Sequence, residues 1–183
     1  MSDPAQIASK RIYTGRVINL DVDRVHFPNG SSGELEIIRH PGASAIVPFL
    51  TEPTATDPQV LLLKQYRYAT GGYLFEIPAG RLDPGESPET CARRELAEET
   101  GCRAASMKFL TSVFTTPGFT DECIHLFMAT GLVRGEARHE ADEFIQIEVM
   151  ALSEALARVQ QGEIKDAKTI LGLLFAAGFQ TGL

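Results

Sequence analysis

An acidic cluster just after a tight turn is the most constraining feature of this sequence. Glu95, Glu98 and Glu99 are spaced so that, in a helix, their side chains project from one side. Like charges at that spacing repel one another and destabilise a bare helix, and a multivalent cation would relieve the repulsion. Because the ligands are all oxygen atoms, the cluster suits Mg²⁺ or Mn²⁺ rather than Zn²⁺.

The residues that flank the cluster predict where its helix begins and ends. Ser87 is a good N-cap, and Pro88 suits the first helical position. Gly101 suits the residue just past the C-terminus, so we expect a helix from about Pro88 to Thr100. A solvated acidic helix is the plainer alternative. The Gly/Pro-rich turn, the caps and the carboxylates nevertheless agree with one another.

The segment from Gly80 to Cys102 resembles the Nudix box. It shows a glycine, five residues, a glutamate, seven residues, and then the run Arg-Glu-Leu-Ala-Glu-Glu-Thr-Gly-Cys. Every fixed position of that motif matches, and Cys102 fills the last aliphatic place as a small hydrophobe. The resemblance implies hydrolysis of a nucleoside diphosphate linked to another moiety, with Mg²⁺ as cofactor or Mn²⁺ in its place. It implies metal ligands at Glu95, Glu99 and the Ala79 carbonyl, a further ligand or base at Glu98, and supporting roles for Gly80, Glu86 and Arg94.

A second stretch points to one branch of that family. Pro117 opens the run Pro-Gly-Phe-Thr-Asp-Glu, which taken alone is a turn between strands. A proline fifteen positions after Cys102, in such a run, resembles the ADP-ribose pyrophosphatase branch. That branch hydrolyses ADP-ribose to AMP and ribose 5-phosphate. The alternatives are a hydrolase of other nucleoside diphosphate sugars such as GDP-mannose, or a non-catalytic nucleotide-binding sensor. A sensor would be favoured by a degraded box, and this box is intact.

Length and charge narrow the class of protein. The 183 residues suit one domain, or one domain with an appendage, and the net charge of −7 argues against a protein that wraps nucleic acid. The three cysteines include no CxxC pair and are expected to be reduced. No apolar run approaches eighteen residues, so we expect a soluble, cytoplasmic protein without a membrane partner.

Residues 1–42 are predicted to form an N-terminal β extension, and residues 43–183 the Nudix domain. Residues 1–10 are expected to be loose or helical, followed by a hairpin with strands at 12–27 and 34–39. In the first strand, apolar Leu20 and Val22 alternate with Asp21 and Asp23. A hairpin of this size cannot bury a core alone, so we expect a homodimer built through it.

The rest of the chain alternates between strands and helices. Strands are expected at 43–50, 59–66, 73–77, 107–114, 124–130 and 144–149. Further helices are expected from a Ser153 cap to about 161, and from an Asp166 cap to about 179. The sum is an α/β fold, an α/β/α sandwich with a mixed sheet, which is also the fold that the Nudix resemblance implies.

The remaining site candidates have plainer alternatives. Glu140 and Glu143 lie in or beside a polar loop, which by composition is simply exposed. In the resembling branch such a loop carries an acidic residue that closes over the metals as ligand or base. Glu143 matches that place best and Glu140 is the alternative, although sequence alone does not separate them. Arg67 is either a fork for a diphosphate or a surface arginine. Glu76 either pairs with it or contacts the substrate. By resemblance, the other substrate contacts are Gly118 and, from a neighbouring subunit, Arg16, Glu36 and Arg39.

Overall fold

The computed structural model describes residues 5–138 and 144–178 and divides them into two compact units. The first unit holds residues 5–42 together with Val113–Cys123. The second holds Ala43–Ser112 and the described residues from Ile124 onward. The box helix and nearly all of the strands in the sheets that carry it lie in the second unit.

The first unit contains a three-stranded antiparallel sheet rather than a hairpin. Its strands are β1 (Gln6–Thr14), β2 (Asn19–His26) and β3 (Ser32–Arg39), in the order β1-β2-β3. The expectation of a loose or helical start is therefore wrong for the described part of residues 1–10. The side chains of β1 are all exposed, so no period-two burial pattern marks this strand. Backbone pairing with β2 defines it instead.

The more buried face of β2 carries its aspartates rather than its apolar residues. Asp21 and Asp23 are buried, whereas the apolar residues between and beside them are only half-buried. Arginines make this burial possible: Arg11 bonds to Asp21, and Arg39 bonds to both aspartates and to Asp121. The hydrogen bond from Arg11 outweighs burial and lowers the pKa of Asp21. A buried carboxylate paired in this way stays charged.

The second unit is built from two sheets. A mixed sheet has the order β7-β4-β9-β8, with β4 parallel to β9 and antiparallel to β7. An antiparallel sheet has the order β10-β5-β6. The strands are β4 (Ala43–Pro48), β5 (Gln59–Arg67), β6 (Gly72–Glu76), β7 (Ala79–Arg81), β8 (Cys102–Phe114), β9 (Cys123–Arg134) and β10 (Ile145–Ala151). The last residues of β8 and the first residue of β9 belong to the first unit. Since β8 begins five residues before the expected 107, ladder pairing extends it beyond its most strand-like residues.

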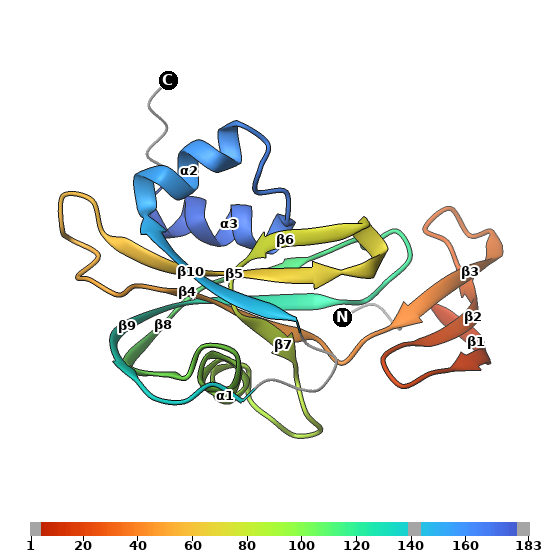
Figure 1. Ribbon diagram of the computed structural model, residues 1–183. Coiled ribbons are helices and arrows are strands. Elements are labelled where there is room, and N and C mark those ends of the chain that lie inside the picture. The colour runs from red at the N-terminus through yellow and green to blue at the C-terminus, as the bar shows by residue number, and fades with distance from the viewer. Residues whose placement is uncertain (1–4, 139–143, 179–183) are drawn as a thin grey trace. The chain divides into compact units, whose positions relative to one another are not determined.

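Helices cover both faces of these sheets. Helix α1 (Pro88–Thr100) lies on one side, and α2 (Leu152–Gln160) and α3 (Ala167–Ala176) lie on the other (Figure 1). A short 3₁₀ turn, Tyr68–Thr70, joins β5 to β6. This layering, with a mixed sheet among its layers, confirms the predicted α/β/α sandwich.

Two details of the C-terminal helices differ from expectation. Ser153 does not cap α2, which begins one residue earlier after Ala151. Its hydroxyl donates instead to Asp57, 2.7 Å away. Asp166 caps α3 as predicted, by accepting a hydrogen bond from the Thr169 backbone N–H, and the helix ends at Ala176. No helix within residues 5–138 and 144–178 is long and apolar enough to cross a membrane.

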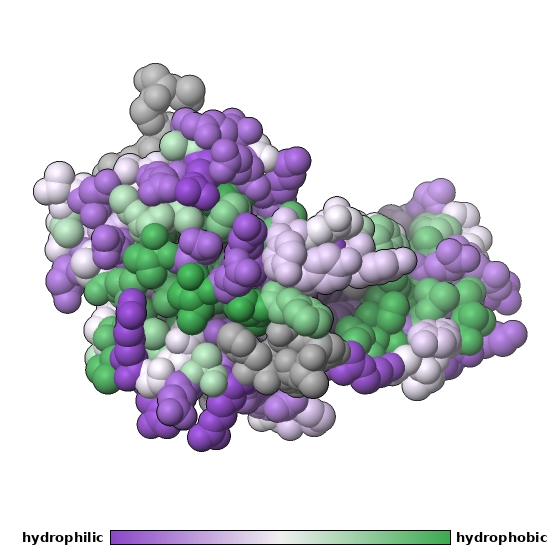
Figure 2. All heavy atoms as spheres, in the orientation of Figure 1, coloured by the Kyte–Doolittle hydropathy of each residue, from purple (hydrophilic) through white to green (hydrophobic). Residues whose placement is uncertain are grey.

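The core explains how α1 is oriented. Ala92 and Leu96 are fully buried against Ile46, Leu61 and residues near them. Burying a side chain such as Leu96 stabilises the fold by about 1.5–3 kcal/mol, so this face of α1 is held inward and the acidic positions are turned toward the site. The edge strand β10 is less covered. Ile147 and Val149 on it are 44% and 41% exposed. Figure 2 shows hydrophobic surface over the part of the second unit where β10 runs.

Candidate active site

Helix α1 begins and ends where the sequence predicts. The Ser87 side chain accepts a hydrogen bond from the Thr90 backbone N–H, and Pro88 is the first helical residue. Gly101 follows the helix with φ of 71°, a conformation that glycine adopts without strain. These caps fix the helix register, and that register decides where each acidic side chain projects.

Arg94 joins the acidic side chains of the box into one network. Its Nε and Nη2 donate to Glu86 over 3.0 and 2.9 Å, and its Nη1 donates to Glu95 over 2.6 Å and to Glu98 over 3.1 Å. The hydrogen bond from Arg94 is the main reason why the pKa of Glu86 falls to about 2, although burial opposes it. The same bonds raise the pKa of Arg94. Glu86 and Arg94 therefore stay charged at neutral pH, and the arginine offsets the repulsion among the glutamates.

Strand β7 brings its backbone against this network. The Ala79 N–H donates to Glu99, 2.9 Å away, and Glu99 is only 3% exposed. Gly80 lies under the Glu95 carboxylate, and a Cβ there would stand 1.9 Å from Glu95 Oε1. Glycine at residue 80 thus leaves room for the Glu95 carboxylate, and its backbone conformation does not by itself require a glycine. Cys91 makes a further contact between α1 and β7, because its thiol donates to the Gly80 and Arg81 carbonyls.

The residues around α1 fit a hard divalent cation. The donors are the carboxylates of Glu95, Glu98 and Glu99 beside the backbone of Ala79, and oxygen donors of this kind suit Mg²⁺ or Mn²⁺. In the described parts of the chain, no three acidic, histidine or cysteine side chains are gathered closely enough to enclose a metal ion as they stand. An entering cation would compete with Arg94 for the oxygens of Glu95 and Glu98.

Arg67 and Glu76 form a separate ion pair where β5 and β6 run side by side. Arg67 Nε and Nη2 donate to the two carboxylate oxygens of Glu76 over 2.7 and 2.8 Å. Glu76 is only 2% exposed, whereas the Arg67 side chain is 41% exposed. Burial acts to raise the pKa of Glu76, but the hydrogen bond from Arg67 and nearby positive charge outweigh it and lower the pKa. Of the two alternatives for Glu76, the structure shows the pairing with Arg67.

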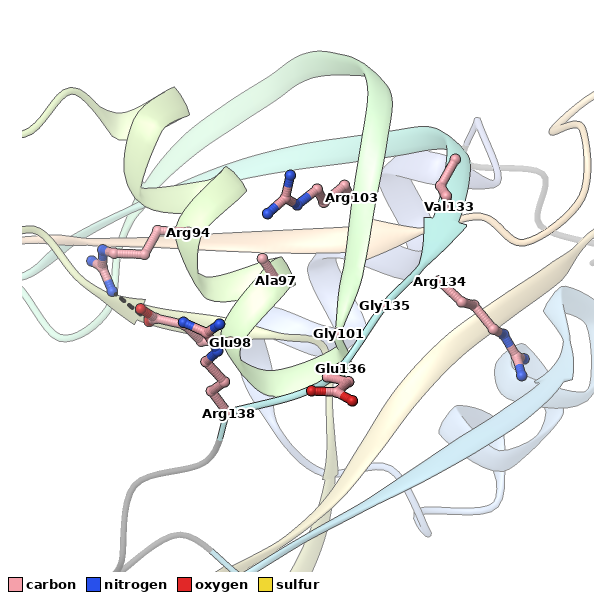
Figure 3. Close-up of a pocket in the computed structure, with 10 residues that line it drawn as sticks. All are labelled: Arg94, Ala97, Glu98, Gly101, Arg103, Val133, Arg134, Gly135, Glu136 and Arg138. Carbon is pink, nitrogen blue, oxygen red and sulfur yellow. Dashed lines mark hydrogen bonds and ion pairs between the residues drawn. The ribbon is translucent and has the colours of Figure 1, made fainter.

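An open pocket of about 600 Å³ lies beside the C-terminal half of α1 (Figure 3). In Figure 3, Arg94 reaches Glu98 at one side of this pocket, and Arg134 points away from it. The segment after β9 is tied to the helix end, since the backbone N–H groups of Gly135 and Arg138 donate to the Gly101 and Glu98 carbonyls, each over 2.7 Å. The pocket is lined by Arg94, Ala97, Glu98, Gly101, Arg103, Val133, Arg134, Gly135, Glu136 and Arg138.

The other sequence candidates belong to the first unit or fall outside the described residues. Arg16, Glu36, Arg39 and Gly118 belong to the first unit, where Arg39 is engaged by three aspartates as described above. Glu36 is exposed on β3. Glu140 and Glu143 fall outside the described residues.

Sequence reasoning missed Lys168, whose ammonium lies 2.5 Å from Glu76 Oε2. One feature of the sequence could have indicated that Lys168 has a carboxylate partner. Lys168 is a lone cation in the first turn of an otherwise apolar helix, at the end where the helix dipole disfavours positive charge. A lysine in that position needs a carboxylate partner, and sequence spacing does not identify which one.

Comparisons with known proteins place the chain in a family. The NUDIX domain description matches residues 40–171. The chain is 40% identical over 171 residues to the methanol dehydrogenase activator of Bacillus methanolicus, and 39% identical over 171 residues to the ADP-ribose pyrophosphatase of Bacillus subtilis. Both alignments cover 92% of this chain and 90% of the relative. Over 121 residues it is 42% identical to the GDP-mannose pyrophosphatase of Cronobacter sakazakii, which covers 61% of this chain and 63% of that protein.

A solved structure agrees on the fold. The crystal structure of an ADP compounds hydrolase superposes with a TM-score of 0.80, at 20% identity, covering 98% of this chain and 95% of that one. The sequence motif, the layered fold and these relatives agree, and the chain belongs to the Nudix family of pyrophosphohydrolases.

Proposed function

We propose that this enzyme hydrolyses the diphosphate linkage of ADP-ribose, giving AMP and ribose 5-phosphate, with Mg²⁺ as cofactor and Mn²⁺ able to replace it. One observation carries the proposal: an intact acidic network around Arg94, in a chain 39% identical over nearly its whole length to a protein named ADP-ribose pyrophosphatase. The Pro117-to-Glu122 run resembles the same branch.

Each residue of the network has a role in this proposal. Glu95, Glu99 and the Ala79 carbonyl hold the cation, and Glu98 is a further ligand or the base. A divalent cation bound here offsets phosphoryl charge and lowers the pKa of a bound water. Glu98 has the access that a base needs, because its side chain is 46% exposed while that of Glu95 is 12% exposed. Glu143 and Glu140 remain the other candidates for the base.

Arg94 and Glu86 support this arrangement rather than react. Arg94 orients Glu95 and Glu98 through one nitrogen, while Glu86 fixes the other edge of its guanidinium. Arg67 offers donors to the diphosphate from β5. Gly118, Arg16, Glu36 and Arg39 contact the nucleoside part, the last three from a neighbouring subunit of a homodimer.

A GDP-mannose hydrolase is the second candidate, because of the relative of that name at 42% identity over 121 residues. A non-catalytic sensor is disfavoured because every fixed position of the box is filled.

We also propose that the enzyme works in the cytoplasm. All three cysteines are free, as expected for a reducing compartment.

A substrate panel tests the proposal. ADP-ribose, GDP-mannose, ADP-glucose, diadenosine polyphosphates and nucleoside triphosphates are compared by nucleotide release, with and without a chelator. We expect the highest kcat/KM for ADP-ribose, loss of activity with chelator, and recovery with Mg²⁺ or Mn²⁺. A clear preference for GDP-mannose would replace the first candidate with the second, and cleavage of triphosphates alone would reject both.

A further inference from the structure

Glu76 sits in a buried site between two cations from distant parts of the chain. Arg67 donates to both of its carboxylate oxygens, and Lys168 Nζ lies 2.5 Å from Oε2. Glu76 is 2% exposed and Lys168 is 12% exposed, so solvent screens this cluster little. The Nudix box includes none of these three residues.

The Arg67 guanidinium is fixed along one edge and open along the other. Its Nε and Nη2 are used by Glu76, and Nη1 makes no hydrogen bond to another residue in the described chain. With 41% of its side chain exposed, Arg67 still presents donors to solvent. A fork held in this way needs little reordering when it meets a phosphate oxygen, because an arginine that binds two oxygens in a plane is already oriented.

Arg67 also lies within the electrostatic field of the acidic site. Its pKa is raised chiefly by the hydrogen bond to Glu76, and the negative charges of Glu99 and Asp166 contribute further. Glu99 is the buried carboxylate of the box that accepts the Ala79 N–H. Arg67 therefore lies near enough to Glu99 for their charges to interact.

Lys168 is itself held by the start of α3. Its Nζ lies 3.1 Å from Asp166 Oδ2, and Asp166 accepts hydrogen bonds from the backbone N–H and the hydroxyl of Thr169. The fully buried Thr169 hydroxyl in turn accepts the Ile77 N–H over 2.8 Å, directly after Glu76. The N-terminus of α3 thus contacts both the side chain of Glu76, through Lys168, and the backbone of Ile77, through Thr169. Asp166 offsets the charge of Lys168, so the cluster serves orientation rather than net charge.

We propose that Lys168 is a positioning residue for Arg67. It holds the Glu76 carboxylate in one orientation, and Glu76 holds the guanidinium with its Nη1 edge open to a diphosphate oxygen of the substrate. The terminal torsion of a glutamate is soft, so without Lys168 the carboxylate turns and carries the guanidinium with it. The inference rests on the proposed function, because it assigns Arg67 to the diphosphate.

Lys168→Met tests the proposal, with Lys165→Met as the matched control, an exposed lysine three residues earlier. Lys168→Arg should restore the contact. The first readout is the hydrogen-exchange rate of the Arg67 Nε–H, measured by ¹H–¹⁵N NMR and assigned with an Arg67→Lys variant. We expect slow exchange in the wild type and in Lys165→Met, and exchange at least tenfold faster in Lys168→Met.

The second readout is kinetic. We expect KM for the preferred nucleotide sugar to rise at least tenfold in Lys168→Met while kcat changes less than threefold, and Lys168→Arg to recover most of the loss. A lower melting temperature with KM and Nε–H exchange unchanged would show a purely structural lysine and overturn the proposal. If the wild type hydrolysed no nucleotide sugar, the proposed function would fail, while the NMR measurement would still decide whether Lys168 positions Arg67.

Discussion

Gly80→Ala should remove activity while leaving the fold intact. An alanine Cβ at this position would lie 1.9 Å from Glu95 Oε1 and 2.0 Å from Glu95 Cδ. Those atoms form the far end of a flexible side chain, so the carboxylate can move aside at little cost to the backbone. The backbone φ at Gly80 is not in the left-handed region, and alanine adopts it without strain.

The size of the effect follows from the displacement. To reach an ordinary contact of 3.4 Å, Glu95 Oε1 must move by about 1.5 Å. A misplacement of about 1 Å in a catalytic group costs roughly 10²-fold in rate, so kcat should fall at least ~100-fold, or about 2.7 kcal/mol in the activation barrier. Stability should change by less than about 1 kcal/mol, since helix α1 and its buried face are untouched.

Steady-state hydrolysis and urea unfolding, measured on the same preparations, check both halves of this prediction. Gly72→Ala is the matched control, because an added Cβ at that β6 glycine meets nothing within 4 Å. It should keep full activity. Wild-type turnover in Gly80→Ala would refute the reasoning, and so would a loss of activity that merely followed a loss of folded protein.

Three further predictions concern the box and the N-terminal unit. Glu99→Gln should lower kcat by about a thousandfold, or ~4 kcal/mol, because it removes a proposed cation ligand yet keeps an acceptor for the Ala79 N–H. Glu89→Gln, at an exposed position on the same helix, should leave kcat unchanged. Near wild-type turnover of Glu99→Gln in Mg²⁺ would contradict the proposed site. Glu86→Gln should lower the urea midpoint at pH 7, with the difference from wild type shrinking as pH falls from about 5 toward 2. The folded pKa of Glu86 is about 2, below its ordinary value. The ionised carboxylate therefore stabilises the fold fully above the unfolded pKa, and this stabilisation is lost as pH falls through the folded pKa. An equal difference between variant and wild type at pH 7 and at pH 2 would reject the prediction. Removal of residues 1–40 should dissociate the proposed homodimer and weaken substrate binding, and sedimentation of a full-length monomer with full activity would rule that role out.

The box helix could be predicted because its determinants are local. Ser87, Pro88 and Gly101 define its ends within a few residues of the helix itself. The spacing of the glutamates then sets their common side. Hydrogen bonds within one helix and its caps do not depend on residues far along the chain, so sequence alone is enough for this element.

Burial that depends on distant partners could not be predicted. Asp21 and Asp23 occupy the polar half of an alternating strand, yet they are buried because Arg39 reaches them from 18 and 16 residues away. Period-two alternation separates the two faces of a strand without saying which one is covered. The same holds for Lys168 and Glu76, which are 92 residues apart, and α3 brings them together only through the tertiary fold.

Arg94 changes what the acidic helix means for folding. Glutamates at helical spacing repel one another, and a cation was the first remedy that the sequence suggested. The structure contains a second remedy, because Arg94 contacts Glu86, Glu95 and Glu98 at once. Arg94 therefore offsets part of the repulsion among the glutamates without a metal ion. In the proposed site, a cation bound to Glu95 and Glu98 would replace part of an existing ion pair. Its net effect on stability would then be the difference between two favourable interactions. We therefore expect the strength of cation binding to depend on how readily Arg94 releases these carboxylates.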